Sequence, residues 1–303
     1  MPRKVMITGA GGFAGAYLAP LLADAGYHVV GLVNGRADSA RNGISELYQL
    51  DLRNLNAVKS AVLEIRPSHV VHLAAISFVA HENISELYET NIVGTKNLLV
   101  SLSELAEKPQ AVLLASSANV YGNVGNADLS PLKEVDPINP PNDYAISKIA
   151  MEYLARQFYD RLNIIIARPF NYTGRGQSEN FIVPKIVKHF RDRIPSIELG
   201  NIDISRDFTD VRATVQYFRL MMECPDAVGR IYNICSGLSL SLKYILSECE
   251  RLTGHSMDVK INPAFVRANE LKCLVGSPQK LHDEIGRVGA YPFERTLQWM
   301  LEA

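Results

Sequence analysis

The first 170 residues alternate between short, wholly apolar segments and longer segments with helical periodicity. The apolar segments are KVMITG, HVVGLV, LYQLDL, HVVHLAA, AVLLASS and NIIIARP. Strands that are apolar along their whole length, rather than at alternate positions, are typical of a parallel sheet covered on both faces. The order β-α-β-α therefore predicts an α/β fold with a doubly wound parallel sheet.

The rest of the chain differs in composition and periodicity. After Arg168, proline, glycine and asparagine become frequent in RPFNYTGRGQSENF, and the regular alternation stops. A further strand is predicted at GRIYNICSG, followed by helical patterns at SLKYILSECERLTG, SPQKLHDEIG and FERTLQWMLEA. We expect one domain formed by residues 1–170 with about 206–235, and a smaller α/β region at the C-terminal end formed by about 171–205 and 236–303.

Charge and cysteine content argue against several classes of function. The chain carries 31 lysines and arginines against 32 acidic residues, and a net charge of −1 gives no case for binding nucleic acid or an anionic membrane. The four cysteines form no C-x-x-C pair, and no histidine or cysteine spacing fits a metal site. No signal peptide precedes the first strand, and no apolar run reaches membrane-spanning length. We therefore expect a cytoplasmic protein with reduced thiols.

A glycine pattern joins the first predicted strand to the first predicted helix, in ITGAGGFAGAYLA. Gly9, Gly12 and Gly15 have the spacing G-x-x-G-x-x-G. Glycine there permits a tight turn and lets a pyrophosphate approach the backbone N–H groups at the helix N-terminus. The context predicts a dinucleotide site; the alternative is a turn that only joins the two elements.

The end of the second predicted strand indicates which dinucleotide is bound. NAD sites usually place an acidic residue there, which accepts a hydrogen bond from the ribose 2′-hydroxyl. Here the segment VNGR supplies Asn34 and Arg36 but no carboxylate. Because a guanidinium pairs well with phosphate, NADP(H) is the preferred cofactor and NAD(H) the alternative. Asp51, after the third strand, either accepts from the adenine amino group or begins a turn.

A tyrosine and a lysine share one face of a predicted helix in NDYAISKIAMEY. Tyr144 and Lys148 are four residues apart there. Tyrosine ordinarily has a pKa of about 10, and an adjacent ammonium favours the phenolate, which makes tyrosine a usable proton donor beside a cofactor. The fifth strand ends in Ser116 and Ser117, at the edge where such sheets bind ligands. A serine hydroxyl there can hydrogen-bond a substrate carbonyl while the tyrosine protonates it.

In this order, the segments TGAGGFAG, HLAA, ETNIVGT, SSANVYG, YAISK and RPFNYTGRGQ resemble the extended short-chain dehydrogenases/reductases that act on nucleotide sugars. The resemblance covers essentially the whole chain and implies a Rossmann fold. It implies that Tyr144 is the acid/base and that Lys148 holds the nicotinamide ribose and lowers the tyrosine pKa. It also implies that Ser117 orients the sugar and that Asn91 supports the helix geometry and a proton-relay water. Besides the three glycines, the implied cofactor contacts are Phe13, Asn34, Arg36, Asp51, Leu52, Leu73, Ala74, Ala75, Tyr144 and Lys148.

The residues after Ser117 separate the activities of this family. Relatives that are 4,6-dehydratases carry an acid/base pair there, whereas this chain has Ala118 and Asn119, which do not exchange protons at neutral pH. Relatives similar to GDP-fucose synthase use a cysteine close to that serine, but the first cysteine here is Cys224. A 4-epimerase and a 4-keto reductase remain, and the missing acid after the second strand favours the reductase.

Later segments narrow the resemblance. PFNYTGRGQSENFIVPKIV, ELGNIDISRDFTDVR, YNICSG and RANELKCLVGSPQKLHDEIG are most similar to GDP-6-deoxy-4-keto-D-mannose reductases. This implies reduction of GDP-4-keto-6-deoxymannose to GDP-D-rhamnose. Reduction with the opposite configuration at C4 would give GDP-6-deoxytalose instead. The sequence does not distinguish guanine from uracil or thymine as the base of the nucleotide. A UDP-hexose 4-epimerase is the alternative, and a non-catalytic NADP-binding regulator is the alternative of another class. The implied substrate contacts are Ser77, Ser117, Asn119, Asn171, Lys185, Arg206, Arg267 and Glu270. Of these, Arg206 and Arg267 are expected to bind the diphosphate. The alternative is that the two arginines form ion pairs within the protein.

Two long predicted helices have apolar stripes on more than one face, in ISELYETNIVGTKNLLVSLSEL and YAISKIAMEYLARQFY. In the family that the chain resembles, such helices pack into a four-helix dimer interface. We expect a homodimer, although the extra apolar faces could equally be buried within one chain.

Overall fold

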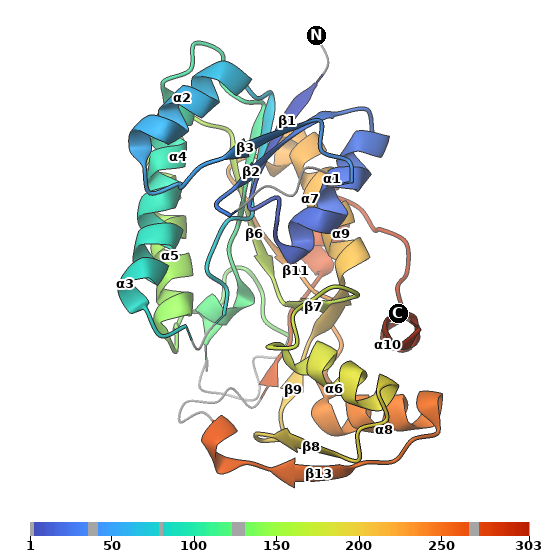
Figure 1. Ribbon diagram of the computed structural model, residues 1–303. Helices are drawn as coiled ribbons and strands as arrows, with labels where there is room; N and C mark the ends of the chain where they lie inside the picture. Colours follow the sequence, from blue (N-terminus) through green and yellow to red (C-terminus); the bar gives the residue numbers. More distant parts are fainter. Residues whose placement is uncertain (1–2, 36–41, 79–80, 123–130, 267–272, 303) are drawn as a thin grey trace.

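A seven-stranded parallel sheet forms the centre of the protein in the computed structural model, which describes residues 3–35, 42–78, 81–122, 131–266 and 273–302 (Figure 1). Its strands are β1 (Lys4–Thr8), β2 (His28–Val33), β3 (Glu46–Gln49), β4 (His69–His72), β5 (Ala111–Ala115), β6 (Ile164–Pro169) and β11 (Ile231–Ile234). They lie in the order β11-β6-β5-β4-β1-β2-β3. All neighbours pair in parallel, and the strand order reverses between β1 and β4. The predicted doubly wound Rossmann sheet is confirmed.

Helices cover both faces of this sheet (Figure 1). One layer contains α1 (Phe13–Asp24), α7 (Val211–Glu223) and α9 (Gln279–Glu284). The other contains α2 (Leu55–Ile65), α3 (Ile84–Tyr88), the π-helix η1 (Glu89–Val93), α4 (Gly94–Ser103) and α5 (Asp143–Arg156). The short 3₁₀ segments η2 (Ala118–Tyr121) and η4 (Pro225–Ala227) follow β5 and α7.

Successive residues of each strand enter opposite cores because side chains alternate along a strand. In β1, Ile7 packs into the core under α1 and α7, whereas Met6 packs into the core under α2, α4 and α5. Both residues are fully buried. This two-sided burial explains why the strands are apolar throughout in the sequence.

A smaller region lies below the carboxyl edge of the sheet in the view of Figure 1. Its strands are β7 (Asn171–Thr173), β8 (Ser196–Leu199), β9 (Ser205–Arg206), β10 (Phe208–Asp210), β12 (Leu240–Ser241), β13 (Asp258–Ile261) and β14 (Cys273–Leu274). Its helices are α6 (Ile182–Arg191), α8 (Leu242–Thr253), α10 (Phe293–Leu301) and the 3₁₀ segment η5 (Pro263–Phe265). Side chains of α6, α8, α10 and β8 form a separate core together with Phe208 of β10. The domain boundaries given above stay a prediction.

Some elements differ from their sequence-based bounds. The predicted helix in ISELYETNIVGTKNLLVSLSEL is interrupted by η1 and ends at Ser103. Helix α5 ends at Arg156, before the end of the predicted helix in YAISKIAMEYLARQFY, and β3 is shorter than LYQLDL. Among the described residues, none of the helices combines the length and the apolar character needed to cross a membrane. Nor do the described histidine, cysteine and acidic side chains form a group of three that could hold a metal ion.

Candidate active site

Three residues predicted to carry catalysis meet beyond the carboxyl ends of β5 and β6. Ser117 begins η2 as its N-cap, and its hydroxyl accepts a 3.2 Å hydrogen bond from the backbone N–H of Asn119. Tyr144 and Lys148 lie on the buried face of α5, with Lys148 Nζ 5.9 Å from the centre of the Tyr144 ring. The Ser117 hydroxyl is a hydrogen-bond partner of the Tyr144 phenol. A proton donor, an ammonium and a hydroxyl therefore share one buried site.

The first residues of α5 fix the rotation of this helix. The Oδ1 atom of Asn142 accepts a 3.0 Å hydrogen bond from the N–H of Ala145, which caps the helix. Asp143 adds a negative charge to the first turn, and its carboxylate accepts a 2.7 Å hydrogen bond from the hydroxyl of Tyr88 in α3. These contacts hold the face that carries the tyrosine and the lysine toward the sheet.

Burial dominates the electrostatics of the pair. It raises the pKa of the Tyr144 phenol, and the hydrogen bond with Ser117 acts in the opposite direction. The resemblance implied a lowered tyrosine pKa, so the net direction in this chain alone is a correction. Its cause is the burial of the phenol itself. Burial also lowers the pKa of the Lys148 ammonium to about 8, against the opposing charge of Glu152. A phenol with a raised pKa is protonated at neutral pH and can donate its proton.

Asn91 lies in the π-helix η1, an arrangement that is common at functional sites. Its Oδ1 accepts a 2.8 Å hydrogen bond from the N–H of Ile76, and its Nδ2 donates to the carbonyl of Ile76 at 3.1 Å and to the hydroxyl of Ser147 at 2.9 Å. That hydroxyl donates a 2.7 Å bond to the Tyr144 carbonyl. Asn91 therefore joins the segment after β4 to the first turn of α5. Its part in a proton relay stays a prediction.

A buried histidine extends this connection to the glycine turn. Thr95 donates its hydroxyl hydrogen to the carbonyl of Asn91 at 2.7 Å, so its oxygen accepts from Nε2 of His72 at 2.9 Å. Nδ1 of His72 then accepts from the hydroxyl of Thr8, 2.6 Å away. The oxygen of Thr8 accepts in turn from the N–H of Ala74 at 3.3 Å. Burial, with the charge of Lys148, lowers the pKa of His72 to about 3, which keeps it neutral.

The glycine turn has the shape that a pyrophosphate requires. Gly9 has a φ of +69°, and a Cβ there would lie 2.7 Å from the backbone nitrogen of Ala74. A Cβ at Gly15 would lie 2.6 Å from the carbonyl oxygen of Ala10, so glycine lets α1 pack closely. Gly12 precedes α1 without a side-chain cap, and only the carbonyl oxygen of Gly9 lies within 4 Å of its Cβ position. The first N–H groups of α1 are therefore approachable by an anion, and these residues fit a dinucleotide.

The other residues predicted to contact a cofactor follow strands at the same edge. They are Asn34 after β2, Asp51 and Leu52 after β3, and Leu73, Ala74 and Ala75 after β4. Phe13, the first residue of α1, stacks on Tyr172 with ring centres 5.9 Å apart and planes inclined by 8°. Arg36 lies outside the described residues. The sheet thus collects these positions around the glycine turn, and their contacts with a cofactor stay predictions.

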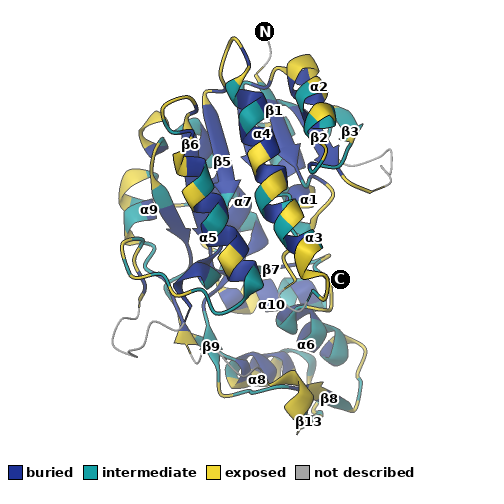
Figure 2. Cartoon of the chain, turned by 90° about the vertical axis from the view of Figure 1, so that its left-hand side faces the viewer, coloured by how far each residue is buried: buried dark blue, intermediate teal, exposed yellow. Residues whose placement is uncertain are grey.

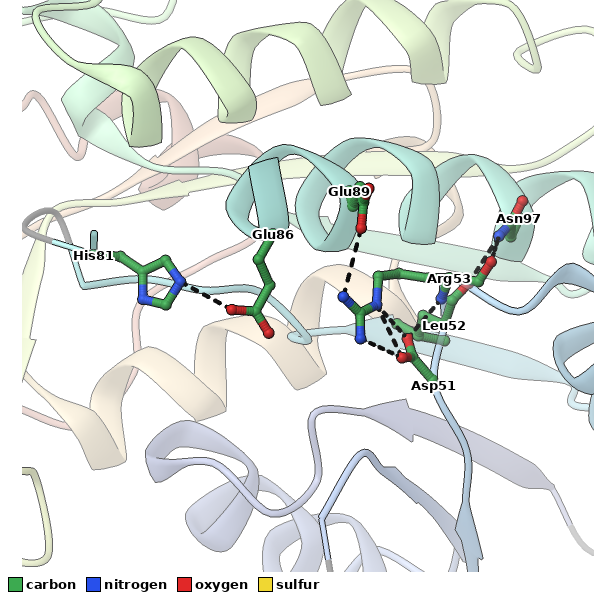
Figure 3. A network of polar contacts seen from close by, with 7 residues as sticks. All are labelled: Asp51, Leu52, Arg53, His81, Glu86, Glu89 and Asn97. Atoms are coloured by element: carbon green, nitrogen blue, oxygen red, sulfur yellow. Dashed lines mark hydrogen bonds and ion pairs between the residues drawn. The ribbon is translucent and has the colours of Figure 1, made fainter. Parts of the chain in front are cut away.

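Asp51 already has a partner within the chain. Arg53 forms hydrogen bonds of 2.6–3.0 Å to both carboxylate oxygens of Asp51 and donates its backbone N–H to Oδ1 at 2.9 Å (Figure 3). These bonds lower the pKa of Asp51. Arg53 also lies 3.5 Å from Glu89, and Nδ2 of Asn97 donates to the carbonyls of Leu52 and Arg53 (Figure 3). Asp51 begins a turn that is anchored to η1 and α4, and its contact with adenine stays a prediction.

The residues predicted to contact the substrate are divided between the two parts of the protein. Ser77 is exposed in the segment after β4. Asn171 opens β7, and its Nδ2 donates a 3.2 Å hydrogen bond to the carbonyl of Asp207. Lys185 on α6 donates to the carbonyl of Glu198 at 2.7 Å. Arg206 lies in β9 and donates to the carbonyl of Ser205 at 2.8 Å. Arg267 and Glu270 lie outside the described residues.

Several residues of this site were missed by sequence reasoning. Burial, with the neighbouring Tyr144, raises the pKa of Tyr172, so a second phenol lies near the first. The carboxylate of Asp207 accepts hydrogen bonds from the N–H and hydroxyl of Ser236 and from the N–H of Gly237, which fixes the strand beside Arg206. Neither residue was marked as a site residue by a motif in the sequence.

Comparisons with known proteins agree with this geometry. Residues 6–300 match the sequence profile of the family described as GDP-mannose 4,6 dehydratase. A GDP-6-deoxy-D-talose 4-dehydrogenase from Aggregatibacter actinomycetemcomitans is 33% identical over 93% of this chain and 91% of its own length. A GDP-6-deoxy-D-mannose reductase from Pseudomonas aeruginosa is 29% identical over 94% of this chain and 92% of its own length.

Solved structures have the same fold over the whole chain. The Pseudomonas aeruginosa protein RMD, solved in complex with NADPH, has a TM-score of 0.85 and 27% identity, with 100% of this chain and 97% of that chain covered. A candidate epimerase from Burkholderia cenocepacia J2315 has a TM-score of 0.91 and 44% identity, with 99% of this chain and 97% of that chain covered. Two of these similar proteins are by name enzymes of GDP-6-deoxyhexoses, and another was solved with NADPH bound to the same fold.

Proposed function

Because this chain belongs to the family described as GDP-mannose 4,6 dehydratase, we propose that it is an NAD(P)H-dependent nucleotide-sugar 4-keto reductase. Its substrate is a nucleotide-linked 4-keto-6-deoxyhexose, GDP-4-keto-6-deoxymannose, and its product is GDP-D-rhamnose. By their names, the two relatives given above act on GDP-6-deoxyhexoses, one as a 4-dehydrogenase and one as a reductase. The same ketone connects these two activities, since talose and mannose differ only at C4.

The observation that carries the proposal is the placement of Tyr144, Lys148 and Ser117 in one buried site beside the glycine turn. That set can protonate a ketone oxygen. Elimination of water would require a further acid/base pair after Ser117, and Ala118 and Asn119 occupy those positions. This supports reduction rather than dehydration within the family.

The mechanism follows from what these side chains can do. A reduced nicotinamide cofactor, held at the glycine turn, would supply the hydride for C4. Tyr144 gives its phenolic proton to the ketone oxygen, and the Ser117 hydroxyl holds that oxygen by a hydrogen bond. One hydride and one proton convert the ketone to the alcohol, and the resulting phenolate is stabilised by the nearby ammonium of Lys148. General acid catalysis of this kind is worth about a hundredfold to ten-thousandfold.

The cofactor is NADPH in preference to NADH. The end of β2 carries no carboxylate for a ribose 2′-hydroxyl, and Arg36 follows at once in the sequence. The similar protein RMD was solved with NADPH, which supports this preference. Arg206 and Arg267 would hold the diphosphate of the substrate, since paired guanidinium groups suit a doubly charged anion.

A homodimer is the proposed assembly. The described residues of α3, η1 and α5 expose the apolar side chains of Ile84, Val93, Ile146 and Tyr153. Figure 2 shows exposed positions along the outer faces of α3, α4 and α5. Two copies that meet through these helices would bury this surface in a four-helix interface.

The decisive experiment supplies purified protein with GDP-4-keto-6-deoxymannose and either NADPH or NADH. We expect loss of reduced-nicotinamide absorbance and a product whose C4 configuration is read by NMR. The similarity to a candidate epimerase favours an epimerase as the second function, and a UDP-hexose 4-epimerase is the form expected from the sequence. Interconversion of a UDP-hexose without added cofactor, together with no consumption of the ketone, would replace the proposal by that second function.

A further inference from the structure

A fully buried ion pair lies behind the candidate active site. Glu152 of α5 and Arg168 of β6 are 0% and 1% exposed. The guanidinium binds the carboxylate through two bonds, Nη2 to Oε2 at 2.7 Å and Nε to Oε1 at 2.9 Å. A bidentate geometry of this kind is the strongest form of carboxylate recognition by arginine. It keeps a negative charge inside the protein, next to the site.

The same carboxylate reaches the turn that carries Ser117. The hydroxyl of Ser116 donates a 2.5 Å hydrogen bond to Oε1 of Glu152. The N–H of Ser116 donates to the carbonyl of Ala167 in β6 at 2.7 Å. Ser116 is therefore held from both its backbone and its side chain, and the position of Ser117 follows from that of its neighbour.

The far side of the arginine is also occupied. Nη1 of Arg168 donates to the hydroxyl of Tyr121 at 3.0 Å, and that hydroxyl donates to Oδ1 of Asn233 at 2.7 Å. Nη1 also donates to the carbonyl of Glu134 at 3.2 Å. The arginine side chain is thus held by Tyr121 of η2, which is itself bonded to Asn233 of β11, and by the carbonyl of Glu134.

Glu152 also shares a helix face with the residues of the site. Tyr144, Lys148 and Glu152 are spaced by four residues along α5, and all three are buried. Two groups on its own helix face the Lys148 ammonium, namely Tyr144 and Glu152. From the sheet it is faced by His72 on β4 and the carbonyl of Ala115 on β5. Arg168 of β6 lies behind Glu152. Of these, only Glu152 is negatively charged.

The energetics argue that this pair has a role besides stability. Two buried charges lose their hydration, and replacement of such a pair by apolar residues of similar volume is often neutral or stabilising. An apolar pair would fill the same space between α5 and β6 but would hold neither Ser116 nor a charge beside Lys148.

We propose that Glu152 is a positioning residue of the candidate active site, which fixes Ser117 through Ser116 and holds a negative charge one helical turn from Lys148. Its effect on turnover rests on the proposed function, whereas its effect on Lys148 is a property of the protein alone. The charge of Glu152 favours the ammonium form, so its removal lowers the pKa of Lys148 further.

The experiment compares four variants with the unaltered protein. Glu152→Gln removes the charge, and Glu152→Met combined with Arg168→Met removes the whole pair without leaving an unpaired charge, in case the first variant does not fold. Ser116→Ala removes the hydrogen bond alone. The matched control is Glu248→Gln, which removes the charge of another buried glutamate that is paired with Arg251 on α8.

The pKa of Lys148 is measured by NMR on lysine-labelled protein without substrate, with the signal assigned by its loss in Lys148→Arg. We expect a downward shift of about one unit in both Glu152 variants and none in Glu248→Gln or Ser116→Ala. In the reductase assay, the alkaline limb of the pH profile of kcat should move down by the same amount in the Glu152 variants. Ser116→Ala should lower kcat about tenfold and leave the limb in place.

An unchanged Lys148 pKa in the Glu152 variants would overturn the proposal. A shifted pKa with an unmoved alkaline limb, or an unchanged kcat in Ser116→Ala, would overturn its catalytic part. If the unaltered protein reduces no nucleotide sugar, the proposed function has failed, and the NMR titration still decides the electrostatic part.

Discussion

The ammonium of Lys148 donates a 2.7 Å hydrogen bond to the carbonyl oxygen of Ala115, the last residue of β5. This bond ties the helix that carries Tyr144 to the strand that ends beside Ser117. The three side chains are therefore held on two elements of the rigid sheet-and-helix framework. A site built in this way should respond to single substitutions by losing chemistry before it loses its fold.

Replacement of Tyr144 by phenylalanine should cut turnover by about a hundredfold to ten-thousandfold, because the proton donor is lost while the ring still fills its place. Cofactor affinity, measured by quenching of protein fluorescence, should stay nearly the same. Tyr153→Phe is the matched control, since Tyr153 is an exposed tyrosine on the same helix. Near-normal turnover in Tyr144→Phe would remove the assigned role.

Replacement of Gly9 by alanine should weaken dinucleotide binding and destabilise the fold. The positive φ at Gly9 alone costs a non-glycine residue about 1–2 kcal/mol, and the new Cβ would press on the backbone of Ala74. Cofactor titration and thermal unfolding measure both effects. Gly289→Ala is the control, because nothing lies within 4 Å of its Cβ position. Equal behaviour of the two variants would contradict the close approach at Gly9.

Replacement of Arg36 by alanine should lower the affinity for NADPH and leave that for NADH almost unchanged. A charge-assisted contact to the 2′-phosphate is worth about 1.5–3 kcal/mol, which is a loss of roughly tenfold to a hundredfold. Parallel titrations with the two reduced cofactors measure the ratio. If the ratio of the NADPH affinity to the NADH affinity is the same in Arg36→Ala as in the unaltered protein, another group selects the cofactor.

The stability of the protein should fall in acid because of His72. Burial lowers its folded pKa to about 3, whereas the unfolded residue titrates near pH 6.5, so between these values the unfolded chain binds a proton that the folded chain does not. This contribution is absent above pH 6.5 and reaches about 2–3 kcal/mol of lost stability by about pH 4.5. Urea unfolding at several pH values should show that the free energy of unfolding falls less steeply with acidification in His72→Gln than in the unaltered protein. Parallel curves for the two proteins would contradict a neutral His72.

Replacement of the exposed Tyr153 by glutamate should convert a dimer to a monomer, because it places buried charge in an apolar interface. Sedimentation velocity at matched concentrations measures the change. Leu63→Glu alters an equally exposed apolar residue on α2 and should have no effect. A monomeric unaltered protein, or a dimer in both variants, would exclude this interface.

Much of the fold could be predicted from sequence because local signals and packing agree. The wholly apolar strands, the glycine turn and the helix around Tyr144 each follow from periodicity and turn chemistry, and each lies where it was expected. The interruption of the helix at η1 could not be predicted, because the segment around Asn91 has ordinary helical periodicity. Its cause is tertiary, since Asn91 bonds to Ile76 and Ser147 from other parts of the chain.

The polar interior was the part that the sequence did not reveal. Glu152 continues the four-residue spacing of Tyr144 and Lys148, which was a usable signal, but its partner Arg168 is on another element. The direction of the Tyr144 pKa was wrong for a related reason. Spacing shows that a lysine is near, whereas the direction of the pKa shift is set by the burial of the phenol itself.

The hydrogen bonds that run from Thr8 through His72, Thr95, Asn91 and Ser147 to Tyr144 have an evolutionary consequence. They hold the dinucleotide turn and the proton donor as one unit, and none of them involves the smaller region. Descendants of such a protein can therefore diversify their choice of sugar by changing residues of the smaller region while inheriting the chemistry intact.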